Sequence, residues 1–81
     1  MHYPYASQAD MAVLMEEAIQ IAWDYLERTG EIEDAEVCSR VLLYHTESMI
    51  RQGNRSRLLL SNRAIRKYME FKINRDLKLA I

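Results

Sequence analysis

Glycine, proline and cysteine are scarce in this 81-residue chain, which contains two glycines, one proline and one cysteine. An all-β domain with many tight turns needs more glycine than this, so long elements joined by short turns are favoured. The single cysteine, Cys38, excludes an intramolecular disulfide, which fits a reducing compartment. We therefore expect stability to come from an apolar core or from a partner subunit.

Long hydrophobic runs are also missing, since no uninterrupted apolar stretch exceeds five residues. A membrane-spanning helix requires about 20 such residues. The amino-terminal residues 1–7 lack the basic start and the apolar segment of a signal peptide. The sequence therefore predicts a soluble, cytoplasmic protein. With 49% hydrophobic and 28% charged residues, residues 1–81 are expected to form a single globular domain.

Helix start and stop signals divide the chain into three segments. Ser7 or Asp10 is a suitable N-cap for the first helix, and Gly30 follows its last turn. Asp34 is a good N-cap for the second helix, which should end before Gly53. The prediction is an all-α three-helix bundle with an up-down-up course and helices near 8–29, 34–52 and 56–78. Residues 1–7 are expected to form an extended amino-terminal arm, because proline restricts the residue before it.

The first predicted helix has an unusually broad apolar face. On a helical wheel the apolar residues of 10–28 cover about 200°, whereas a helix packed from one side needs about 100°. Ala18 and Ala22 lie one turn apart at the middle of this arc, where small side chains allow another backbone to approach closely. This helix is therefore expected to be covered from two directions, with part of its surface in contact with a second subunit.

The other two helices have narrower apolar faces. In the second, His45 is expected at the centre of a face formed by valines, Cys38, Leu42 and Met49, with Leu43 and Ile50 on a second strip. In the third, the predicted core stripe consists of Leu58, Ile65, Tyr68, Met69 and Ile73, with Ser61 and Asn62 embedded in it. A smaller apolar strip consists of Leu60, Ala64 and Phe71. An alternative divides the third helix at Ser61, with the preceding leucines extended.

The net charge of −1 is the sum of two oppositely charged halves. Residues 1–50 contain ten acidic and two basic residues, a charge of −8, and residues 51–81 contain nine basic and two acidic residues, a charge of +7. Three interpretations follow from this division. The two halves pair within one monomer, they pair between subunits, or the basic half binds nucleic acid.

No assembled catalytic set is present in the sequence. The two glycines lie in separate turns, so a glycine-rich phosphate loop is absent. Cys38 and His45 are two helical turns apart, about 10 Å along one helix, which is too far for a nucleophile and its base or for one shared metal ion. We predict no catalytic, cofactor-binding or metal-binding residue. A metal or cofactor site formed by His45 or Cys38 across a subunit boundary is the weakest alternative.

The leading functional prediction is a non-enzymatic helical protein-interaction module, acting as a homodimeric regulator or accessory protein. Its predicted dimer interface lies on the first helix and consists of Leu14, Ala18, Ala22, Trp23, Tyr25 and Leu26. The alternative is a helix-turn-helix-like nucleic-acid-binding domain that uses the basic third helix. Its predicted patch for an anionic partner consists of Arg55, Arg57, Arg63, Arg66 and Lys67.

Overall fold

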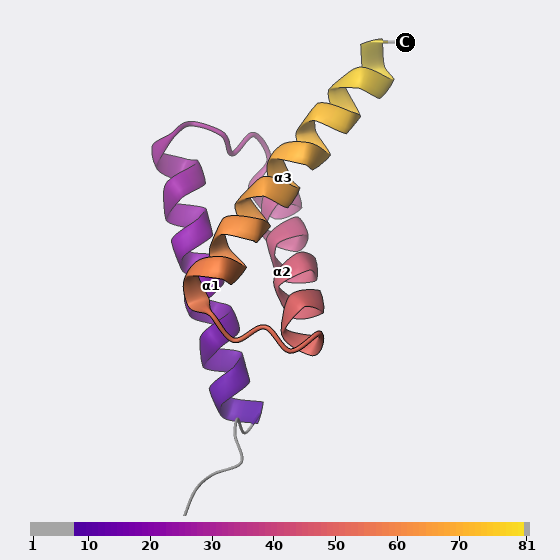
Figure 1. Ribbon diagram of the computed structural model, residues 1–81. Coiled ribbons are helices and arrows are strands. Elements are labelled where there is room, and N and C mark those ends of the chain that lie inside the picture. Colours follow the sequence, from indigo (N-terminus) through magenta and orange to yellow (C-terminus); the bar gives the residue numbers. More distant parts are fainter. Residues whose placement is uncertain (1–7, 81) are drawn as a thin grey trace, which may run out of the picture.

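The computed structural model describes residues 8–80 and contains three helices: α1 (Gln8–Arg28), α2 (Ala35–Arg51) and α3 (Arg57–Ala80). They run up, down and up, and each packs against the other two (Figure 1). The predicted all-α three-helix bundle is confirmed, with helix ends within two residues of the expected positions. The arm predicted for residues 1–7 and the Ser7 cap lie outside the described residues.

The turns form as their residue types predict. Gly30 and Gly53 have φ angles of 74° and 103°, in the left-handed region that favours glycine after a helix. A carboxylate oxygen of Asp34 accepts hydrogen bonds from backbone N–H groups in the first turn of α2, at 3.0 and 3.1 Å. The Ser56 hydroxyl accepts one from Leu59 N–H at 3.2 Å. The connections are therefore short and leave α3 free to pack across both earlier helices.

The core lies where the three helices meet. Ala18 and Ala22 of α1 are fully buried, as expected for small residues at a close helix contact. Their buried neighbours on the three helices include Leu26, Leu42, Leu60, Ala64 and Tyr68. The middle of the broad apolar arc of α1 is thus covered within a single chain by α2 and α3.

The face of α3 that enters the core differs from the prediction. Leu60 and Ala64, assigned to the smaller strip, are fully buried, whereas Leu58 and Ile73 of the predicted core stripe are 66% and 55% exposed. The buried face is interrupted by polar residues, which weakens its apolar signal in the sequence. One of them, Ser61, donates its hydroxyl hydrogen to the Leu58 carbonyl at 3.0 Å. The helix continues through Ser61, so the alternative with a break there is wrong.

The core face of α2 is also rotated from the predicted one. Thr46 is fully buried between buried Leu42 and Ile50, whereas His45 lies at the edge of the face and is only partly buried. Leu43 remains 45% exposed. Thr46 Oγ1 makes no hydrogen bond to any described residue, so the core contains a buried hydroxyl whose lost contact with water no protein hydrogen bond replaces.

The described residues contain no helix that is both long enough and apolar enough to span a membrane. This agrees with the absence of long apolar runs in the sequence.

Replacing Thr46 by valine should stabilise the protein. Valine has nearly the same shape, and the substitution removes a buried hydroxyl that lacks a partner, so we expect the free energy of unfolding to rise by about 1 kcal/mol. The matched control is Thr29→Val, because the Thr29 hydroxyl donates to the Tyr25 carbonyl at 2.9 Å on the surface. Urea denaturation followed by circular dichroism measures both. A destabilised Thr46→Val variant would contradict the packing described.

Candidate functional site

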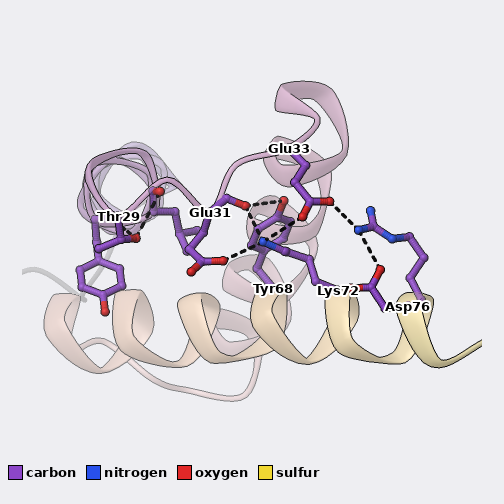
Figure 2. Close-up of polar contacts among 9 residues, drawn as sticks. Thr29, Glu31, Glu33, Tyr68, Lys72 and Asp76 are labelled. Atoms are coloured by element: carbon purple, nitrogen blue, oxygen red, sulfur yellow. Dashed lines mark hydrogen bonds and ion pairs between the residues drawn. The ribbon is translucent and has the colours of Figure 1, made fainter.

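A buried lysine joins α3 to the linker between α1 and α2. Lys72 is only 8% exposed, and its ammonium group donates to the Glu31 carbonyl at 2.8 Å and to Glu31 Oε1 at 2.7 Å. It also lies 3.4 Å from Glu33 Oε2 and 5.6 Å from the centre of the Tyr68 ring. Figure 2 shows Lys72 and Tyr68 projecting from α3 toward Glu31 and Glu33. This cluster fixes the position of α3 against the first two helices.

The charges in this cluster change the proton affinities of its members. Hydrogen bonds from Arg75 and Lys72 lower the pKa of the Glu33 carboxyl below its usual value of 4.5. The hydrogen bond to Glu31 is the main reason that the pKa of Lys72 is raised above 10.5, although burial opposes it. Arg75 Nη2 lies 2.6 Å from Glu33 Oε1 at the surface. We interpret the cluster as structural, because carboxylate or carbonyl oxygens already engage its cations.

The predicted anionic-partner patch is divided in the structure. Arg55 donates to the Ile50 carbonyl at 2.8 Å and so caps the end of α2. Arg57 pairs with Glu17 of α1 at 2.9 Å. The remaining three members, Arg63, Arg66 and Lys67, line one groove between α2 and α3. The structure therefore assigns two of the five residues to internal contacts and places the other three together.

The groove has a volume of about 560 Å³. Polar side chains on the α2 side include His45, Ser48 and, just after the end of the helix, Gln52. Burial is the main reason that the pKa of His45 is lowered below 6.5; the Lys67 charge adds to this effect and Glu70 opposes it, so the environment favours the neutral imidazole. The single carboxylate in the lining is Glu70, which lies 3.7 Å from Lys67. The groove is thus a polar, net basic surface.

The predicted dimer-interface residues fall in two environments. Ala18, Ala22 and Leu26 are fully buried inside the monomer. Leu14 and Trp23 are partly buried against the core clusters. Tyr25 is 44% exposed and is the member of the set that faces solvent most openly. Most of the apolar surface predicted for a partner subunit is therefore used by the chain itself.

A second group of exposed apolar side chains lies at the carboxyl-terminal end of α3. Ile73, Leu77 and Leu79 are 55%, 59% and 78% exposed. The carboxyl-terminal end of α3 extends past α1 and α2 in Figure 1. Sequence reasoning gave Ile73 to the core and made no prediction for the two leucines. The length of the third helix could be predicted from the sequence, but the part of it that α1 and α2 cover could not.

Lys72 is the main residue that sequence reasoning missed. A signal was present, because Lys72 follows Tyr68 by one turn and Ser61 by three turns on the same face of α3. The two linker glutamates, Glu31 and Glu33, supply the opposite charge. A lysine in line with core residues indicates a buried or half-buried charge that requires a partner.

The described residues contain no group of three or more histidine, cysteine or acidic side chains that could hold a metal ion. Cys38 is fully buried, and burial raises the pKa of its thiol, which disfavours the reactive thiolate. The chain matches no protein-family model, no curated protein sequence and no solved structure. Any functional conclusion therefore depends on the chain's own geometry.

Replacing Lys72 by methionine should destabilise the bundle by about 2 kcal/mol, because it removes charge-assisted hydrogen bonds to a partly buried carbonyl and carboxylate. Lys78→Met is the matched control, since Lys78 is exposed on the same helix. Urea denaturation measures both variants. Equal stability of the two would show that the Lys72 cluster does not hold α3 in place.

The same cluster predicts how stability depends on pH. Because the folded pKa of Glu33 lies below its unfolded value, its contribution is complete above about pH 4.5 and is lost as the pH falls through the folded pKa. Because the pKa of Lys72 is raised, its contribution is present below about pH 10.5 and is lost as the pH rises further. Glu33→Gln should therefore reduce the loss of stability in acid. The control Glu16→Gln, at an exposed residue of α1, should leave that loss unchanged. The measurement is the melting temperature of each protein at a series of acidic pH values. Identical curves for Glu33→Gln and the parent protein would contradict the stabilising role given to the Glu33 carboxylate.

Proposed function

We propose that this protein is a non-enzymatic helical interaction module that forms a homodimer through the exposed end of α3. The observation that carries the proposal is the group of apolar side chains Ile73, Leu77 and Leu79 on the extending part of α3. Ile73 and Leu77 lie one turn apart on the same side of α3, whereas Leu79 lies on the opposite side. Isolated exposed apolar residues are normal on protein surfaces, but two neighbouring ones on one side of a helix give a partner a surface to cover.

Charge complementarity supports a second copy of the chain as the partner. On α1, the carboxylates of Glu16 and Glu27 form no ion pair with any described residue. On α3, the guanidinium groups of Arg63 and Arg66 also form no ion pair with any described residue. A second copy supplies both the apolar segment and the opposite charges, and a two-fold dimer makes each contact twice.

The interface proposed here is shifted from the one predicted on α1 alone. Tyr25 and its neighbour one turn earlier, Ile21, are 44% and 37% exposed and remain available on the edge of α1. The buried alanines of α1 are not available without opening the core. The proposed dimer therefore combines the end of α3 with the exposed edge of α1.

The helix-turn-helix-like alternative receives less support. Such a domain reads the major groove with residues near the start of its second helix. Here the arginines in that position, Arg55 and Arg57, are held by the end of α2 and by Glu17. Nucleic-acid binding remains a prediction, and the protein-interaction module is the better explanation of the exposed apolar residues.

Replacing Leu77 by lysine should weaken the dimer without unfolding the monomer, because Leu77 is 59% exposed. Val13→Lys, at a residue 51% exposed on the polar side of α1, is the matched control. Sedimentation equilibrium over a range of concentrations should give about twice the 9.6 kDa chain mass for the parent and the control, and a lower mass for Leu77→Lys. A parent protein that stays at 9.6 kDa at about 100 μM, roughly the weak end of specific association, would refute the proposed dimer.

A further inference from the structure

The groove between α2 and α3 gathers basic side chains that the fold itself does not use. Arg63 and Arg66 form no ion pair or hydrogen bond with any described residue. By contrast, Arg57 pairs with Glu17, and Lys72 is engaged by the α1–α2 linker. Several exposed cations along one groove create a positive local potential that attracts anionic ligands.

The charge of the groove indicates the charge of its ligand. Arg63, Arg66 and Lys67 contribute three positive charges, and Glu70 contributes one negative charge. The Lys67–Glu70 pair is long, at 3.7 Å, and both side chains are about half exposed, so it is weak and easily replaced. The neutral His45 adds no charge at pH 7. A ligand group with two negative charges therefore matches the net charge.

The groove also offers neutral hydrogen-bond donors opposite the cations. Ser48 and His45 of α2 and Gln52, which follows the end of α2, are all in the lining, and each carries a donor group suited to an anionic oxygen. Two arginines on one wall provide several N–H groups in planar arrays, which is the arrangement that favours phosphate. The groove volume of about 560 Å³ lies within the range of small-molecule sites.

We propose that this groove binds a small ligand with a phosphomonoester group, held by Arg63, Arg66 and Lys67 of α3 and by donors from α2. A phosphomonoester carries nearly two negative charges at pH 7 and presents three acceptor oxygens. A phosphodiester, as in nucleic acids, carries one charge per phosphate and matches the groove less well. The site shares Arg63 and Arg66 with the charge pairing proposed for the dimer, whereas the apolar end of α3 lies outside its lining.

The test compares adenosine monophosphate with cyclic adenosine monophosphate on the full chain. The two share the same base and ribose, but the first is a monoester dianion and the second is a diester monoanion. Pyrophosphate serves as a dianionic or more highly charged probe without a nucleoside. Titrations followed by nuclear magnetic resonance should show pyrophosphate and the monoester shifting the signals of His45, Arg63 and Arg66, with affinity decreasing as salt increases.

Substitutions distinguish binding in the groove from non-specific attraction of anions to the charged surface. Arg63→Gln and Arg66→Gln should each weaken monoester binding about tenfold, which is the effect of losing one charge-assisted contact. The matched controls are Arg40→Gln and Arg51→Gln, because these exposed arginines of α2 pair locally with Glu36 and Glu47. The controls should bind normally. Circular dichroism confirms that each variant is folded, and Lys67→Gln provides a third groove substitution should either arginine variant lose its helices.

Three results would overturn the proposal. The first is the absence of any signal change at about 10 mM pyrophosphate or monoester, which is weaker than ordinary ligand binding. The second is equal loss of affinity in groove and control variants. The third is binding of the cyclic diester or of a single-stranded oligonucleotide in preference to the monoester, which would assign the groove to nucleic acid instead. Repeating the titrations with Leu77→Lys, a substitution outside the groove lining that should weaken the dimer, separates failure of the ligand site from failure of the dimer.

Discussion

Lys72 is the constraint on which the arrangement of the three helices depends. Its ammonium group is nearly inaccessible, so it requires oxygen partners within the protein, and the α1–α2 linker supplies a carbonyl and two carboxylates. A cation with fixed partners has one favourable position, whereas apolar contacts tolerate small sliding movements. The cluster therefore defines the register of α3 against α1 and α2, and the leucine and alanine contacts fill the space between them.

The register of α3 determines which surfaces remain open. The small side chains of Ala18, Ala22 and Ala64 allow the helices to approach closely, and the core closes around Leu26 and Tyr68. The end of α3 beyond Lys72 then has little to pack against, apart from the surface pair of Arg75 and Glu33. The same placement that completes the core thus leaves Ile73, Leu77 and Leu79 accessible to a partner.

The charge division of the sequence is partly resolved inside the monomer. Arg57 pairs with Glu17, and Lys72 and Arg75 pair with linker glutamates, so acidic and basic halves do meet within one chain. The pairing is incomplete. The acidic face of α1 and the basic groove beside α3 both retain unpaired charges, and these two surfaces are where the proposals for a second copy and for a phosphate-bearing ligand arise.

The helices and their ends were determined by local sequence, because caps, glycines and apolar periodicity act within a few residues. Asp34, Gly30 and Gly53 are clear examples, and the bundle class followed from them. Which face of α2 and α3 entered the core was decided by tertiary packing. Polar Thr46 and Lys72 are buried there and weaken the apolar signal of the true core faces in the sequence. For the site, the sequence identified the basic cluster on α3. Only the packing of α3 against α1 and α2 determined that Arg57 is held by Glu17 and that Arg63 and Arg66 line the groove with His45, because side chains distant in sequence meet only in the folded chain.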